Sequence, residues 1–326
     1  MPASRQIQMG GRLTITLHRT CRVPRIKGKS NPLPMSLGQF PIYRVADFLG
    51  NVPERWKREG FFFPVHPQEA MYIGFNRPPT PVALLVGAGM VNAVTGTRLE
   101  PVLDGVKQNY VVVPPQPWLD GFKSEEGSTI QFVAAELGKG ETVEEQILGT
   151  AEFGGIQLGV YEPKISLIPA SRPHEFISSG SFYNEVERTV THSRSFGVAS
   201  CNFTAGTGAR DLGLGVGGAI TQKIYPDEYL NGRDPSEVWG SEPTDKVYIH
   251  LVHASDFKAI TGQDAPASPI TYATYQAQGL PWFMLPDGSW GDVEGSEAID
   301  GLKPVSGGPD PISAVPVVNP LTKDIW

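Results

Sequence analysis

Glycine and proline interrupt this chain so often that long helices are disfavoured over most of its length. The 37 glycines and 30 prolines exceed one fifth of the 326 residues, well above their average combined usage of about 12%. They separate short runs rich in Val, Ile, Phe and Tyr, a combination typical of many short strands joined by turns. We therefore predict a mainly β fold, an antiparallel β-sandwich or jelly-roll-like architecture with a few short helices.

The clearest strand signal begins at residue 13, where Leu13, Ile15 and Leu17 alternate with polar residues. A period of two is that of a strand with one buried face. Similar apolar runs predict further strands near residues 70–75, 81–86, 109–114, 129–134, 155–161, 164–169, 195–203 and 246–254. Short helices are predicted at 52–60, 142–149 and 268–279 from their Pro, Thr-x-x-Glu, Ser-Pro and Gly signals.

Composition also suggests how the chain is divided. We predict a β-rich N-terminal domain at 1–165, a connecting segment at 166–195, a β-rich C-terminal domain at 196–300 and a Pro-rich extended arm at 301–326. One continuous domain is the alternative. The arm carries five prolines, which disfavour a regular helix or a central strand, together with several apolar residues. We expect it to dock along a hydrophobic groove of its own body or of a neighbouring subunit.

Residues 81–96 begin like a dinucleotide-binding domain, with an apolar strand followed by Gly87 and Gly89. That motif needs a third small residue, but Asn92 occupies its place. It also needs a helix, and the β-branched residues that follow favour a strand and a turn. We therefore predict no nucleotide and no other cofactor.

Metal and catalytic signatures are equally weak. His250 and His253 are three residues apart in a predicted strand, so their side chains should point to opposite faces. No metal site is predicted, the acidic loops at 226–237 and 286–300 are interpreted as solvated turns, and the catalytic residues are unknown. The glycine-rich stretch at 206–218 predicts close backbone packing, with a ligand's close approach as the alternative.

Tryptophans in loops with Pro, Gly and Asp are the most suggestive feature. An aromatic ring beside a carboxylate can stack on a sugar, or it can anchor a protein interface. The alternative is that each ring only plugs the core. The candidate ligand-binding residues are Trp118, Asp120, Trp282, Phe283, Trp290 and Asp292.

The formal charge of −7 argues against nucleic-acid binding, and we interpret the basic stretch Arg12–Lys29 as a solvated edge. With no signal-peptide or membrane-spanning run, we expect a cytoplasmic protein without a membrane partner. The predicted function is a soluble binding or assembly module whose Trp-bearing loops contact a protein or carbohydrate partner. A homo-oligomer is a further expectation. The alternatives are a β-fold hydrolase or lyase acting on a saccharide or other polar polymer, and a small-molecule enzyme with a pocket between two β domains.

Overall fold

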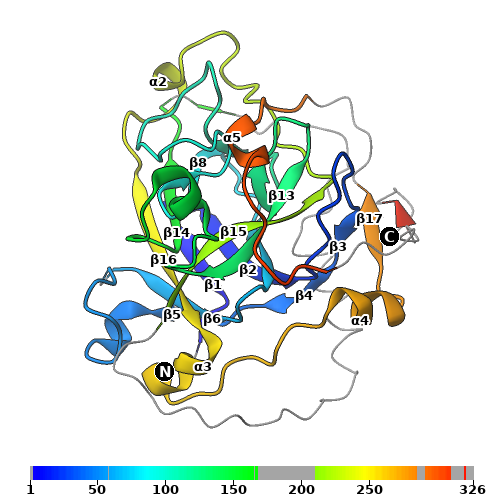
Figure 1. The fold of residues 1–326 in the computed structure, drawn as a ribbon. Coiled ribbons are helices and arrows are strands. Elements are labelled where there is room, and N and C mark those ends of the chain that lie inside the picture. The colour runs from blue at the N-terminus through cyan, green and yellow to red at the C-terminus, as the bar shows by residue number, and fades with distance from the viewer. Residues whose placement is uncertain are drawn as a thin grey trace.

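The protein is mainly β, as the spacing of its apolar runs predicts. The computed structural model describes residues 3–57, 59–164, 166–167, 210–284, 291–309 and 319–320. Strands account for 37% and helices for 12%, and a large antiparallel sheet dominates a sandwich-like fold (Figure 1).

The main sheet follows one path through the described strands. In spatial order these are β1 (Gln6–Met9), β2 (Leu13–Thr20), β7 (Ala70–Phe75), β13 (Thr129–Glu136), β15 (Asp211–Ile220), β16 (Asp245–His253), β14 (Ile156–Tyr161), β8 (Val82–Ala88) and β10 (Val111–Val113). Neighbours along this path are antiparallel. Shorter strands pair beside it: β4 (Ser36–Gln39), β5 (Tyr43–Arg44), β6 (Phe61–Val65), β9 (Val91–Asn92), β11 (Trp118–Leu119) and β12 (Gly121–Lys123).

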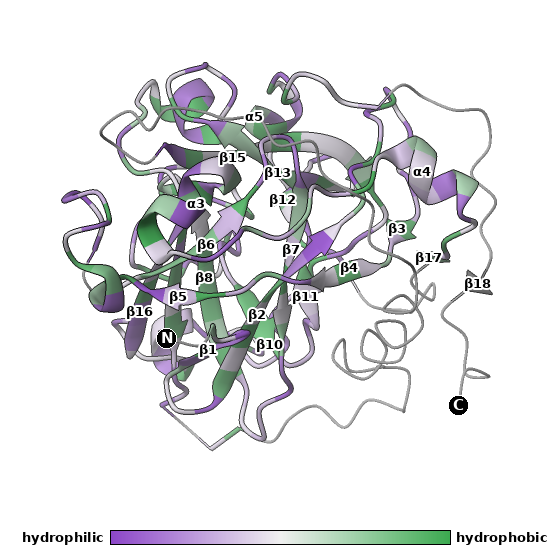
Figure 2. Ribbon diagram, turned by 90° about the horizontal axis from the view of Figure 1, so that it is seen from below, coloured by the Kyte–Doolittle hydropathy of each residue, from purple (hydrophilic) through white to green (hydrophobic). Residues whose placement is uncertain are grey.

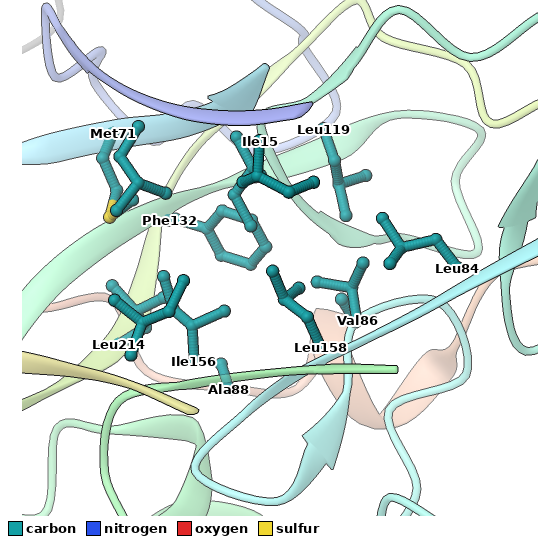
Figure 3. Close-up of a cluster of buried hydrophobic side chains, with 14 of the residues drawn as sticks. Ile15, Met71, Leu84, Val86, Ala88, Leu119, Phe132, Ile156, Leu158 and Leu214 are labelled. Atoms are coloured by element: carbon teal, nitrogen blue, oxygen red, sulfur yellow. The ribbon is translucent and has the colours of Figure 1, made fainter. Parts of the chain in front are cut away.

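The main hydrophobic core cluster lies against this sheet. In β2 the residues Leu13, Ile15 and Leu17 are buried, which confirms the predicted alternation. Ile7 of β1 and Val111 of β10, from opposite ends of the path, belong to the same buried cluster. The sheet therefore wraps around a shared interior, part of which is drawn in Figure 3.

Strands from both halves of the described chain contribute to this sheet. Strand β15 pairs with β13, and β16 pairs with β14. The strands before residue 165 and after residue 209 therefore share one sheet and one core. The predicted connecting segment at 166–195 lies outside the described residues except for positions 166–167.

The helices of the described residues are short. They are η1 (Val45–Phe48), η2 (Glu144–Leu148), α2 (Pro235–Val238), α3 (Ala254–Thr261), α4 (Tyr272–Ala277) and α5 (Glu297–Asp300). In the described parts of the chain, none of them is both long enough and apolar enough to cross a membrane.

Two helix predictions are confirmed in part and one is wrong. The turn at 142–149 is a π-helix that ends at Gly149 in the left-handed conformation, with φ of 71°. Helix α4 begins later than predicted, because Thr271 rather than Ser268 caps it. Residues 51–57 form turns instead of a helix. There Trp56 is buried, and its indole donates to Asp211 over 2.8 Å, so a tertiary contact overrides the local preference.

Both glycine-rich stretches form strands in their described parts. Gly87 and Gly89 lie in and after β8, which pairs antiparallel with β9, so the predicted strand and turn are confirmed. In β15, a Cβ atom on Gly215 would lie 2.4 Å from the Glu141 carbonyl oxygen, and one on Gly218 would lie 2.4 Å from that of Pro24. Close backbone packing therefore requires glycine here. Positions 206 and 208 lie outside the described residues.

Two arginines of the basic stretch donate hydrogen bonds to the segment at 291–309, which we call the C-terminal strap. Arg22 donates to the Ser306 carbonyl over 3.1 Å, and Arg25 donates to the Asp300 carbonyl over 2.8 Å. The prediction of a solvated edge is thus wrong at these two arginines, because their guanidinium groups satisfy carbonyl oxygens of the strap.

Candidate functional site

A second, small sheet lies at one side of the body, next to helix α4 (Figure 2). Its order is β18 (Asn319–Pro320), β17 (Trp282–Met284) and β3 (Leu33–Pro34). Strand β17 pairs antiparallel with β3 and parallel with β18, where Phe283 is opposite Asn319 and Met284 is opposite Pro320. A short piece of the Pro-rich arm is therefore paired with the strand that carries the predicted residues Trp282 and Phe283.

Buried side chains, many of them aromatic, pack together around β3 and β17, and we call this cluster the aromatic floor. The second core cluster consists of Cys21, Val23, Leu33, Met35, Tyr72, Trp118, Ile220, Tyr272, Tyr275, Trp282 and Phe283. The ring of Trp282 meets that of Tyr275 edge-on, with 4.7 Å between centroids. The Tyr275 hydroxyl donates to the Pro281 carbonyl over 2.5 Å and accepts from the Met35 amide over 2.9 Å. Helix α4 thus ties the start of β17 to the body.

Trp118 and Asp120 interact directly beside this floor. The Trp118 indole N–H donates to the Asp120 carboxylate, and the Asp120 amide donates to the Gln222 side chain over 2.9 Å. Asp120 is 5% exposed. Burial raises the pKa of its carboxyl to about 7, although the indole hydrogen bond opposes the shift.

Asp292 is bound to Lys123, which sequence reasoning did not single out. The Lys123 ammonium donates to Asp292 Oδ2 over 2.6 Å, and the other carboxylate oxygen accepts from the Ile224 amide over 3.0 Å. Burial lowers the pKa of Lys123, and Asp292 partly restores it. No local motif marks this lysine, because its partner lies 169 positions away.

The structure brings four of the six predicted residues into one region, and it pairs Asp292 with Lys123 instead. Trp118, Trp282 and Phe283 share the second cluster, Asp120 is bonded to Trp118, and Asp292 belongs to the Lys123 pair. The three rings are 6%, 1% and 4% exposed, so they line the interior and do not form an exposed stacking platform. Trp290 lies outside the described residues, and ligand binding by these residues stays a prediction.

The two histidines of β16 have separate local roles. His250 is buried, stacks on Trp56 with 4.7 Å between ring centroids, and accepts the Lys57 amide at Nε2 over 3.1 Å. Burial lowers its pKa to about 3. His253 caps α3 by accepting the Ser255 amide. Within the described ranges, no group of three or more His, Cys, Asp or Glu residues could hold a metal ion.

The acidic loop at 226–237 is not simply a solvated turn. Asp227 accepts from the Tyr110 hydroxyl over 2.7 Å and from the Trp239 indole over 2.8 Å, while Asp234 caps α2. These carboxylates stabilise the loop through hydrogen bonds to nearby donors. In the second acidic loop, residues 286–290 lie outside the described residues.

Comparison with known proteins adds no relative. No protein-family model matches the chain, and no curated protein or solved structure matches it.

Proposed function

We propose that the protein is a binding and assembly module whose partner is a second copy of the chain. The C-terminal strand β18 of one copy would bind the edge of β17 in another, with the pairing found within the chain. Addition of an extended strand to a sheet edge is a common recognition mode, in which main-chain hydrogen bonds supply affinity. The single observation that carries the proposal is the parallel pairing of β17 with β18.

Chain topology supports exchange of this strand between copies. Strand β18 lies outside the main sheet and, among the described strands, pairs with β17 alone. Nine residues separate it from the strap at 291–309. The intervening nine residues span at most about 30 Å when fully extended. Because β18 is not part of the main sheet, it can leave β17 without breaking that sheet, and exchange of identical elements is a low-cost route to oligomers.

The aromatic floor gives the accepting strand a fixed position. Trp282 and Phe283 are buried in the second cluster, and Tyr275 holds the residue just before them. A rigid edge loses little conformational entropy when a strand binds, which favours affinity. The saccharide alternative would need an exposed aromatic ring, whereas the three described candidate rings are buried.

The test compares the full chain with two deletions by sedimentation over a wide concentration range and by thermal unfolding. Deletion of residues 310–326 removes β18 and should dissociate the oligomer and lower the melting temperature. Deletion of residues 322–326 is the matched control, because it retains β18, and it should preserve the oligomer. A full chain that remains monomeric at every concentration would contradict the proposal.

A further inference from the structure

Asp120 lies where the two hydrophobic clusters meet. Leu119 and Phe122, on either side of it, belong to the main core, whereas Trp118 belongs to the second cluster under β17. The Trp118 indole donates to the Asp120 carboxylate, so this carboxyl touches the aromatic floor directly. A change in its charge therefore acts on the packing that supports β17.

Among the described residues, the Asp120 carboxylate accepts from the neutral Trp118 indole and forms no ion pair. The backbone of Asp120 is also held by neutral groups: its N–H donates to the Gln222 side-chain oxygen, and its carbonyl accepts from the Phe132 amide of β13, each over 2.9 Å. Lys123, the nearest cation along β12, is bound to Asp292. Burial raises the pKa of Asp120, and the Trp118 hydrogen bond opposes this rise.

We propose that ionisation of Asp120 loosens the aromatic floor and the hold of the body on β17, so that a rise from acidic to neutral pH favours release of the strand that β17 binds. The consequence for exchange between copies rests on the proposed function. The loosening of β17 itself does not. Within the described part of the chain, ionised Asp120 is a buried charge that has one indole donor and no ion pair. Water can stabilise this charge only when the contact between the two clusters opens.

The direction of the pH effect follows from which state, closed or open, holds the proton on Asp120. The folded carboxyl has a pKa of about 7 against 3.8 for its ordinary value, so the closed state keeps its proton between these limits. Opening therefore becomes more favourable as pH rises from about 4 to 7 and levels off above that window. If opening solvates Asp120, its equilibrium constant should rise about tenfold between pH 6 and pH 8.

The test is amide hydrogen exchange of the full chain at pH 6 and pH 8, corrected for the intrinsic exchange rates. Protection of the β17 amides should fall about tenfold at pH 8. In Asp120→Asn, which keeps the size and a hydrogen-bond acceptor, protection should be the same at both values. An unchanged protection of β17 in the native chain, or an equal fall in Asp120→Asn, would overturn the inference.

A second variant guards against misfolding of the first. Trp118→Phe keeps an aromatic ring but removes the N–H that favours the ionised carboxyl, so the loss of protection should shift to higher pH. A shift to lower pH, or none, would also overturn the inference. These readouts do not depend on oligomer formation. Loss of β17 protection in a strictly monomeric chain would reject the proposed assembly and retain the role of Asp120.

Discussion

The ammonium of Lys123 lies 2.6 Å from a carboxylate oxygen of Asp292, and the lysine side chain is only 1% exposed. The pair joins β12 to the start of the C-terminal strap. Ser124, the next residue, donates to the Asp300 carboxylate over 2.5 Å, so two adjacent residues hold the strap at two points. The polar contacts of the strap are therefore anchored in the middle of the chain as well as at Arg22 and Arg25.

Asp292→Asn should destabilise the protein strongly, because it leaves the Lys123 cation buried without its counter-charge. Loss of one partner from a buried ion pair costs about 3–5 kcal/mol, measurable as a lower urea midpoint. The double variant Lys123→Met with Asp292→Leu should lose less stability than Asp292→Asn, because it leaves no unpaired buried charge. The control is Lys258→Met, whose pair with Asp264 is exposed and should contribute little. Equal losses in Asp292→Asn and Lys258→Met would contradict this account.

Stability should fall in acid partly because His250 is buried in its neutral form. Its folded pKa is about 3 against 6.5 for the ordinary value, so only the unfolded chain gains the proton between these limits. The contribution of neutral His250 to the free energy of unfolding is fully present above about pH 6.5. It is lost as pH falls towards 3, by about 1.4 kcal/mol per pH unit.

His250→Phe keeps a ring for stacking on Trp56 but loses the acceptor for the Lys57 amide. We expect it to be less stable than the native chain at pH 7.5. That deficit should shrink by about 2–3 kcal/mol at pH 4.5, measured by urea unfolding. Tyr248→Phe is the control, and its difference from the native chain should be the same at both pH values. A deficit of His250→Phe that does not change with pH would refute the prediction.

Glu144 organises the turn before β14. Its buried carboxylate accepts the amides of Glu152, Phe153 and Gly154 over 2.7–2.8 Å. In Glu144→Gln one acceptor oxygen becomes an NH2 group that faces an amide donor. The expected loss is about 1.5–3 kcal/mol, read from the thermal unfolding midpoint, whereas Glu152→Gln at an exposed position should be nearly neutral. The carboxylate would not have the role assigned here if both substitutions were neutral.

Gly121 is expected to tolerate no side chain. A Cβ atom at this position would lie 1.8 Å from the Ile130 carbonyl oxygen, across the β12–β13 pairing, so the backbone would have to move. Gly121→Ala should therefore sharply reduce the yield of folded protein, judged by circular dichroism and gel filtration. Gly159→Ala is the matched strand control, since its nearest neighbour lies 3.5 Å away. If Gly121→Ala folded like the native chain, the backbones of β12 and β13 would have room for a Cβ atom at this position, which would contradict the prediction.

Sequence reasoning was most successful where neighbouring residues decide the structure. The alternation of Leu13, Ile15 and Leu17, the turn after Gly87 and the helix end at Gly149 depend on side-chain period and backbone conformation, which a short window contains. The β-rich class follows from the same signals repeated along the chain. Of the predicted arm, residues 301–309 and 319–320 are described, and the latter two pair with β17.

Only the tertiary structure decided which polar and aromatic groups are buried and what they contact. Turns form where a helix is predicted, because the Trp56 ring stacks on His250 and its indole donates a hydrogen bond to Asp211. Lys123 and Asp292 are far apart in sequence, and their pairing depends on the order of the strands and the path of the strap. The local alternation and the turns follow from the order of the residues, since they need only adjacent residues. The buried carboxyl, lysine and aromatic floor arose from long-range contacts, because desolvation and charge pairing depend on what the whole fold places around each group.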